Sequence, residues 1–329
     1  MGLTVEMASL GGTPAQDDKT ATNGQSPQEA AARLFRSVRA GRSWLRAQGA
    51  AALSAGACVP MRPGNDEPPV FMLPGAPGSI LQLGPIASAV PGTMPVYAIK
   101  PRGLGGDEAP CDSIREMAEY SIAIIREVRP AGPYLLVGYS AGGLVALEMA
   151  QVLTAAGHQV PLVVLMDTYP SRQTWPLRCH VEVLGRQVFR ALWALRRYSL
   201  AGAWREAVRR LRSLSDYLAA SGVKALPPPP VLIEGSSAAS RRLYLATYNA
   251  GEAYRPARYG GKVVFIQPDE VPNLEPRSPW LVWRQFLTDM EVRRVPGTTH
   301  LGMVDVGAAA TAAAIGECLA RAGFASQSM

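Results

Sequence analysis

The stretch that decides the fold is Tyr134-Leu135-Leu136-Val137-Gly138-Tyr139-Ser140-Ala141-Gly142-Gly143-Leu144-Val145-Ala146-Leu147-Glu148. Apolar residues run into the pattern Gly-x-Ser-x-Gly, and a segment with helical periodicity follows at once. Strand, sharp turn and helix in this order are the context of a nucleophile elbow. Gly138 and Gly142 lack Cβ atoms, so strand and helix can approach closely on either side of Ser140. The motif alone also fits an ordinary glycine-rich turn with an incidental serine, and the rest of the chain must decide between these interpretations.

Short apolar runs alternate with helical patterns on both sides of this stretch. We expect strands at 70–73, 96–99, 134–138, 161–166, 262–266 and 291–295, and helices at 113–128, 142–156 and 307–322. Strands that are apolar throughout are typical of a parallel sheet covered on both faces. The sequence therefore predicts an α/β fold with a mostly parallel central sheet and helices on both faces.

Composition narrows the possible partners. The chain has 329 residues, 48% of them hydrophobic, and a net charge of +7, which suits an acidic partner but does not by itself indicate nucleic acid. The four cysteines are widely spaced and form no metal motif, so we expect them to be reduced. No apolar run reaches the roughly 20 residues that span a bilayer, and no secretory signal is expected at the start. We expect a cytoplasmic protein with no cofactor, metal, membrane or nucleic-acid partner.

The pattern divides the chain into three parts. Residues 1–67 are expected to be a flexible arm with an amphipathic helix across 28–50 and a proline-rich linker across 59–69. Residues 68–322 are expected to form the α/β domain, and 323–329 a tail. Within the domain the alternation breaks between roughly 171 and 257, which predicts a mostly helical lid.

The lid is rich in arginine. Nine arginines and two acidic residues lie between Arg178 and Arg212, and Arg186 falls opposite the apolar side of the expected helix. These arginines fit either a solvated helix face or a docking surface for an acidic partner.

A serine nucleophile needs a base, and the chain has three histidines. His158 lies in the loop that enters the 161–166 strand, at the end of the sheet opposite the elbow. His180 lies near the beginning of the predicted lid. His300 follows the 291–295 strand, at the carboxyl ends of the strands where Ser140 also lies. His300 is therefore the predicted base.

Two aspartates could orient this histidine. Asp167 ends the 161–166 strand and Asp269 follows the 262–266 strand, and both preserve the order Ser, Asp, His. Asp167 is favoured because it directly continues a buried strand beside the elbow. The backbone N–H groups of Ala141 and Ala76 are the predicted oxyanion donors, one at the helix start and one in the loop after the 70–73 strand.

Several motifs together resemble the type I thioesterase domains of nonribosomal peptide and polyketide synthases, in the α/β-hydrolase superfamily. The resemblance spans roughly residues 68–322 and is carried by 73–79, 101–104, 132–134, 138–143, 148–150, 165–168, Trp283 and 295–300. It implies an α/β-hydrolase fold with the lid inserted between the sixth and seventh strands. In that family the acid follows the strand after the elbow helix, which matches Asp167.

The resemblance implies a serine thioesterase of secondary-metabolite biosynthesis. Members of the family release an acyl or peptidyl group from a carrier protein's phosphopantetheine thioester, by water or by an internal nucleophile. The carrier or synthase module is expected to act in trans on a stand-alone enzyme. Two alternatives remain open at this point: a carboxylesterase or lactonase acting on free small esters, and a catalytically silent binding protein with this fold.

Overall fold

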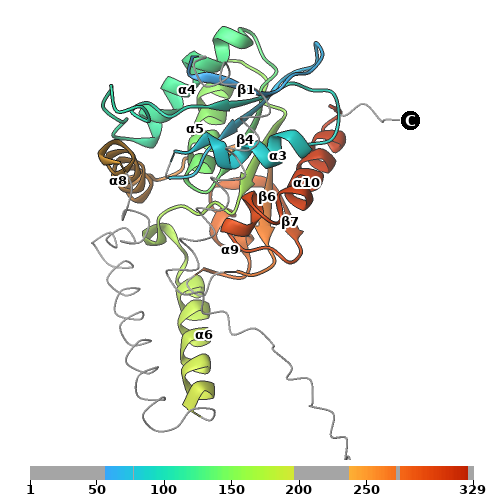
Figure 1. The fold of residues 1–329 in the computed structure, drawn as a ribbon. Coiled ribbons are helices and arrows are strands. Elements are labelled where there is room, and N and C mark those ends of the chain that lie inside the picture. The colour runs from blue at the N-terminus through green and yellow to red at the C-terminus, as the bar shows by residue number, and fades with distance from the viewer. Residues whose placement is uncertain (1–55, 77, 196–236, 272–274, 325–329) are drawn as a thin grey trace, which may run out of the picture.

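A computed structural model describes residues 56–76, 78–195, 237–271 and 275–324, with side chains omitted for 190–195 (Figure 1). The expected helix across 28–50 lies outside these residues, as does most of the expected tail. The described chain forms a seven-stranded sheet in the order β1-β3-β2-β4-β5-β6-β7. All neighbouring strands are parallel except β1, which pairs antiparallel with β3.

The strands follow the apolar runs of the sequence. Their bounds are β1 Cys58–Arg62, β2 Val70–Leu73, β3 Val96–Ile99, β4 Leu135–Tyr139, β5 Leu162–Met166, β6 Tyr259–Pro268 and β7 Leu287–Val295. Every residue of β2, β4 and β5 is buried, because helices cover both faces of the sheet centre. The predicted α/β-hydrolase fold with a mostly parallel sheet is confirmed.

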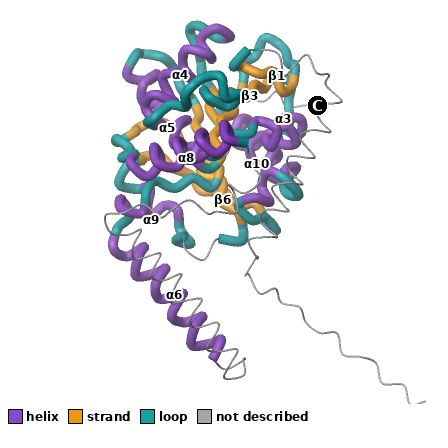
Figure 2. Tube along the Cα trace, turned by 60° about the vertical axis from the view of Figure 1, so that its left-hand side comes forward, coloured by secondary structure: helices purple, strands orange, loops and turns teal. Residues whose placement is uncertain are grey.

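Helices form a layer on each side of the sheet. Figures 1 and 2 show α4 (Ile114–Val128) and α5 (Ala141–Ala155) on one face, and α3 (Gly84–Ala89) and α10 (Ala308–Arg321) on the other. The N-terminus of α4 is capped by Ser113, whose hydroxyl accepts the Glu116 N–H at 3.1 Å. Helix α5 is apolar almost all round, as expected for a helix packed between the sheet and its neighbours.

The prediction of a linker across 59–69 is wrong for its first residues. Residues 58–62 form the edge strand β1, although the sequence predicts a proline-rich linker across 59–69. Pro60 pairs with Tyr97, where the register shifts before Arg62. Proline is tolerated in a strand at a sheet edge, since its missing N–H need not bond a second neighbour. Val59 and Met61 are buried under α3, so the packed body begins before residue 68.

The helical insertion follows β5. It contains a short 3-10 turn η2 (Arg172–Thr174), α6 (Leu177–Leu195) and α8 (Ala238–Ala253), while 196–236 lie outside the described residues. The insertion therefore lies between the fifth and sixth described strands, where the resemblance implies the sixth and seventh. After β6 come α9 (Pro279–Trp283), β7, the short turn η4 (Leu301–Val304) and α10.

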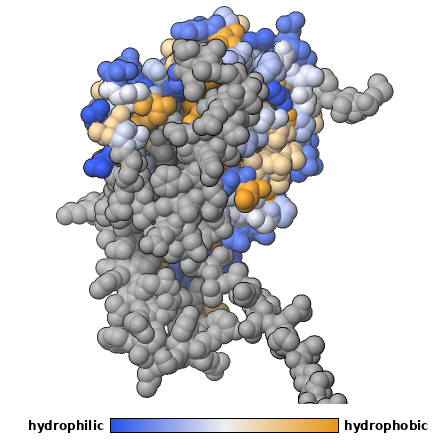
Figure 3. All heavy atoms as spheres, in the orientation of Figure 1, coloured by the Kyte–Doolittle hydropathy of each residue, from blue (hydrophilic) through white to orange (hydrophobic). Residues whose placement is uncertain are grey.

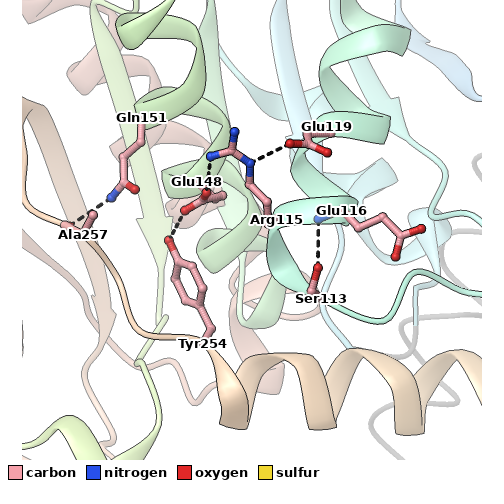
Figure 4. A network of polar contacts seen from close by, with 8 residues as sticks. All are labelled: Ser113, Arg115, Glu116, Glu119, Glu148, Gln151, Tyr254 and Ala257. Atoms are coloured by element: carbon pink, nitrogen blue, oxygen red, sulfur yellow. Dashed lines mark hydrogen bonds and ion pairs between the residues drawn. The ribbon is translucent and has the colours of Figure 1, made fainter.

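A buried carboxylate ties the end of the insertion to the core (Figure 4). Glu148 of α5 accepts a hydrogen bond from the Tyr254 hydroxyl at 2.6 Å and pairs with Arg115 of α4 at 3.1 Å. Gln151, one turn further along α5, donates to the Ala257 carbonyl at 3.0 Å. Burial, together with the bond to Glu148, raises the pKa of Tyr254, so this hydroxyl remains a donor at neutral pH.

Helix α6 extends away from the sheet in both views (Figures 1 and 2). Its residues Cys179 and Val183 are buried, whereas Val181, Val188 and Phe189 are exposed. The apolar pattern of the sequence places Val181, Leu184 and Val188 on one side of this helix. Of these only Leu184 packs against the core, so most of the predicted apolar side does not meet the body. Elsewhere on the described surface, Figure 3 shows mainly hydrophilic or neutral residues with small hydrophobic groups between them. No described helix combines the length and apolarity needed to cross a bilayer.

Glycines allow β4 and α5 to meet at close range. A Cβ on Gly138 would lie 2.4 Å from the Gly142 carbonyl oxygen, and a Cβ on Gly142 would lie 2.4 Å from the Pro74 carbonyl oxygen. Both contacts are with backbone, which cannot move without displacing a strand or a helix. The close approach predicted from the sequence is thus a steric requirement of the fold.

We expect Gly138→Ala to lower the free energy of unfolding by at least 1–3 kcal/mol, the typical cost of overpacking. The matched control is Gly185→Ala, because Gly185 lies in α6 and an added Cβ there has no described atom outside its own helix within 4 Å. That substitution should stabilise the protein by up to about 1 kcal/mol through helix propensity. Urea unfolding followed by circular dichroism measures both, and a Gly138→Ala protein as stable as the wild type would contradict the packing argument.

Candidate active site

Ser140 occupies a strained turn between β4 and α5. Its backbone has φ 53° and ψ −124°, a region that residues with a side chain rarely adopt. The Ser140 N–H donates to the Met166 carbonyl at 2.9 Å, and the Thr168 hydroxyl donates to the Ser140 carbonyl at 3.0 Å. Gly75, in the loop after β2, packs so tightly that a Cβ there would lie 3.3 Å from Ser140 Cβ. Neighbouring strands thus hold the turn in place.

Asp167 and His300 form a hydrogen-bonded pair. Asp167 Oδ2 lies 2.7 Å from His300 Nδ1, and the Asp167 side chain is 2% exposed. Asp167 directly continues β5, and its own φ of 45° turns the chain away from the sheet. The His300 ring is 31% exposed. Because Nδ1 is bonded to Asp167, Nε2 is the ring atom left to exchange a proton with another group.

Asp269, the alternative partner of the histidine, does not bond to the His300 ring in the described structure. Asp269 is exposed, and its backbone N–H donates to the Val295 carbonyl at 3.2 Å. In the described structure His300 bonds to Asp167 and not to Asp269.

Two effects oppose each other at the His300 ring. Burial lowers the pKa of His300, but the hydrogen bond and the charge of Asp167, with a contribution from Glu275, outweigh it. The net result is a pKa above the ordinary value of 6.5.

Tyr139 contacts His300 through both its ring and its hydroxyl, a role that the sequence did not predict. Its ring stacks on the His300 ring with centroids 4.9 Å apart, and its hydroxyl donates to the His300 carbonyl at 3.1 Å. Burial, together with the charge of Asp167, raises the pKa of Tyr139, so the hydroxyl stays protonated and can donate. In the sequence Tyr139 is indistinguishable from any other aromatic residue of a buried strand.

Two threonines hold the loop that carries His300. Thr298 donates to the Val295 carbonyl at 2.6 Å, and the Thr299 hydroxyl accepts the Gly302 N–H at 3.0 Å. Trp283 of α9 donates to the Thr168 carbonyl at 2.9 Å, which braces the segment after Asp167.

A cavity of about 390 Å³ joins these groups. Its walls come from the elbow, the loop after β2, the segment after β5, α8 and the His300 loop. The lining residues are Gly75, Ala76, Gln82, Tyr139, Ser140, Ala141, Leu144, Asp167, Tyr169, Ser171, Tyr244, Thr247, Tyr248, Gly251, Glu252, Glu275, His300 and Leu301. The three candidate side chains and both candidate oxyanion residues therefore border one space.

The predicted nucleophile and the predicted base are not yet in contact. No hydrogen bond joins the Ser140 hydroxyl to the His300 ring among the described residues, although both line the cavity. Such contacts are often long in a ligand-free enzyme and shorten when substrate binds. Ala141 is the first residue of α5, and Ala76 lies in the loop that packs against the serine.

The other two histidines lie outside the lining of this cavity. His158 packs edge-on against Tyr134 with centroids 5.8 Å apart, in the loop before β5. His180 lies in α6, 6.0 Å from the Trp175 ring, and burial lowers its pKa. The described residues hold no group of three His, Cys, Asp or Glu side chains suited to a metal ion.

The structure places two charged residues, Arg186 and Glu275, where the sequence did not predict them. Arg186 is largely buried, donates to the Glu275 carbonyl and pairs with Glu182 at 3.8 Å, so it is not part of an exposed docking surface. Glu275 lines the cavity, and no sequence signal marked it. It lies in a connection between β6 and α9, where only tertiary packing decides what faces inward.

A second, smaller cavity of about 40 Å³ adjoins the first. It shares Gly75 and Thr247 with the larger one, and its walls are mainly apolar, including Ile99, Met117 and Val145. The apolar lining suits a hydrocarbon part of a ligand.

Comparisons with known proteins show which families the chain is similar to. A family model described as the thioesterase domain matches residues 68–222. Vanchrobactin synthetase VabF of Vibrio anguillarum is 34% identical over 121 residues, which are 36% of this chain and 4% of that protein. Microperfuranone synthase of Emericella nidulans is 40% identical over 102 residues, which are 31% of this chain and 11% of that protein. The chain thus spans a small fraction of the length of these curated relatives.

A solved structure extends the likeness beyond the matched segment. It is the NocB thioesterase domain in covalent complex with a fluorophosphonate nocardicin G analog. That domain is 25% identical, with a TM-score of 0.52, and the match covers 78% of this chain and 96% of that one. Residues 68–222, which include the Ser140 turn and Asp167, are therefore similar to the thioesterase domain family.

Proposed function

We propose that this protein is a serine thioesterase that releases an acyl or peptidyl group from the phosphopantetheine thioester of a carrier protein. The observation that carries the proposal is the cavity bordered by both the strained Ser140 turn and the hydrogen-bonded pair of Asp167 and His300. A serine on such a turn, beside an imidazole oriented by a carboxylate, is the arrangement that activates a hydroxyl for acyl transfer.

The first half of the proposed reaction transfers the acyl group to the enzyme. The Ser140 hydroxyl oxygen attacks the thioester carbonyl carbon while His300 Nε2 takes the hydroxyl proton. Asp167 holds the ring by Nδ1 and stabilises the imidazolium. The N–H groups of Ala141 and Ala76 stabilise the oxyanion. When the carbon–sulfur bond breaks, the imidazolium gives its proton to the departing thiolate, which leaves as a thiol.

The second half frees the acyl group from Ser140. Water, or a hydroxyl or amine within the acyl chain, attacks the ester carbonyl while His300 takes its proton. His300 then returns that proton to Ser140 as the ester bond breaks. Water gives hydrolysis and an internal nucleophile gives cyclisation. In this proposal the enzyme needs no cofactor of its own, because the phosphopantetheine arrives with the carrier.

The carrier as partner is supported by the relatives. VabF and microperfuranone synthase are named as synthetase and synthase, and the match covers a short segment of each. We propose that a carrier protein or synthase module of the same kind presents the thioester to this cavity. Comparing hydrolysis rates on an acyl-pantetheine thioester and on the matching oxygen ester distinguishes this function from a carboxylesterase, which would favour the ester.

Covalent labelling tests the nucleophile. A fluorophosphonate should label the wild-type protein at Ser140, and Ser140→Ala should abolish labelling because it removes the hydroxyl that the strained turn holds at the cavity beside His300. Intact-mass spectrometry measures the adduct. Ser88→Ala, which removes an exposed serine on α3, should be labelled like the wild type. Persistent labelling of Ser140→Ala would refute the assignment, and a wild type that resists labelling would favour a catalytically silent protein.

Paired substitutions test the acid. Asp167→Asn should lower kcat by about 10⁴-fold, because the amide favours the wrong tautomer of the histidine. Asp269→Asn should leave kcat near the wild-type value, since that side chain is exposed and His300 Nδ1 is bonded to Asp167. Steady-state hydrolysis of one acyl-pantetheine thioester by the three proteins gives the comparison. Equal losses in the two variants would contradict the assignment of Asp167.

The pH profile tests the environment of the base. Catalysis needs neutral His300, whose pKa is raised above 6.5, so kcat/KM should increase with pH and reach half its plateau above pH 6.5. In Asp167→Asn the hydrogen bond and charge that raise the pKa of His300 are weakened, while burial still lowers it. The residual activity of this variant should therefore reach half its plateau at lower pH. An unmoved midpoint would show that another group controls the profile.

A further inference from the structure

The smaller of the two cavities lies where part of a substrate on Ser140 could enter it. Gly75 and Thr247 border both cavities, so the two spaces adjoin along these residues. A Cβ on Gly75 would lie 3.3 Å from Ser140 Cβ, which puts this shared wall directly beside the predicted nucleophile. An acyl group attached to Ser140 therefore starts next to the small cavity.

Apolar side chains from several elements form the walls of the small cavity. Leu73 and Ile99 come from the ends of β2 and β3, Met117 from α4, Val145 from α5 and Leu243 from α8. All of these except the half-buried Met117 are buried. Because the sheet, two core helices and the insertion all contribute, the packing of the fold fixes the shape of the cavity. An apolar space of this kind favours hydrocarbon over water.

Two of the polar side chains in the walls are already engaged with other parts of the protein. Ser121 donates its hydroxyl to the Met117 carbonyl at 2.7 Å, within α4. Arg102 donates to the Ala109 carbonyl at 3.0 Å and pairs with Glu116. The amide groups of a pantetheine arm would need hydrogen-bond partners here, whereas an alkyl chain needs none. The walls therefore fit the acyl side of the substrate better than the pantetheine side.

The size of the small cavity limits what can enter it. Its volume is about 40 Å³. A site of roughly 10–15 Å³ holds one water molecule, and a methyl or methylene group is only a little larger, so the cavity has room for about three carbon atoms.

We propose that the small cavity binds the alkyl end of the acyl group and limits the length of chain that the enzyme accepts. The substrate class is then an acyl group that ends in a short alkyl segment, and Met117 is a residue that determines the permitted length. This inference rests on the proposed thioesterase function and deepens it by assigning a substrate class.

The test uses amide analogues of acyl-pantetheine, in which nitrogen replaces the thioester sulfur and cleavage is prevented. Linear acyl groups are lengthened one methylene at a time from acetyl to decanoyl, and isothermal calorimetry gives each Kd. Affinity should rise about fourfold for each methylene that enters the cavity, and by less than about twofold per methylene once the cavity is full. The length at which this change occurs is the break in the series.

A polar end group tests the alternative occupant. At the break, an analogue with a hydroxyl in place of the terminal methyl should bind at least about fivefold more weakly, because the walls are mainly apolar. Tyr120 and Thr247 also line the cavity and carry hydroxyls, so stronger binding of the hydroxyl analogue would indicate a polar occupant and overturn the inference.

Substitutions at Met117 test whether this cavity causes the break. Met117→Ala leaves more room, so the break should move to a longer chain, and the first chain beyond the wild-type break should bind about fourfold more tightly. Met117→Phe should move the break to a shorter chain. The matched control is Met290→Ala, because Met290 is half-buried against the same core cluster but borders neither cavity. Its break should stay at the wild-type length.

Three results of this series would overturn the inference. They are affinity that rises evenly to decanoyl, a break that Met117→Ala does not move, and no measurable binding of any analogue. If Met117→Phe does not fold, as judged by circular dichroism, Met117→Ala decides alone.

Turnover of the matching thioesters separates this inference from the proposed function. Thioesters left uncleaved by the wild type would count against thioesterase activity, while a break that moves with Met117 would still support the alkyl site. Cleavage of every chain length with the same kcat/KM, together with binding that shows no break, would retain the thioesterase and remove the alkyl site.

Discussion

The structure depends on the steric constraint where β4 turns into α5. Ser140 can adopt its strained backbone because glycine on either side lets the strand, the helix and the first loop pass within contact distance. Strain of this kind costs about 1–3 kcal/mol and persists only where the surroundings over-determine the conformation. Here β5 supplies the Met166 carbonyl and the Thr168 hydroxyl, and the buried strands on both sides leave the turn no other path.

Parallel register then brings the second strained residue beside the first. Tyr139 pairs with Met166, so the next residues of the two strands, Ser140 and Asp167, leave the sheet side by side. Strand β6 continues further, to Pro268 opposite Val295, and Asp269 leaves the sheet beyond that point. The choice between the two aspartates is therefore a consequence of where each strand ends.

The elbow also positions the histidine. Tyr139 precedes the serine, and its ring and hydroxyl both contact His300. One short segment thus holds the nucleophile and the support of the base, although His300 lies 160 residues further along the chain. The loop that carries His300 therefore has to place the imidazole against the Tyr139 ring.

The sequence could predict the features that depend on local pattern. Buried parallel strands appear as continuous apolar runs, and the elbow appears as glycines at fixed spacing around Ser140. Edge strand β1 was missed because Pro60 reads as a linker unless the edge position is known. The buried side of α6 was missed because helical periodicity identifies apolar sides without saying which one meets the body, and Cys179 and Val183 do so. Glu275 carries no pattern at all, since its burial results from packing between segments distant in the sequence.

Asp167 and Glu275, two of the carboxyl residues that line the cavity, show how environment separates identical chemistry. Asp167 has an imidazole that can share its charge, whereas the buried oxygen of Glu275 has no partner and its pKa is raised to about 8. Burying a second carboxylate near the first is costly, so burial and the charge of Asp167 together favour the protonated form of Glu275.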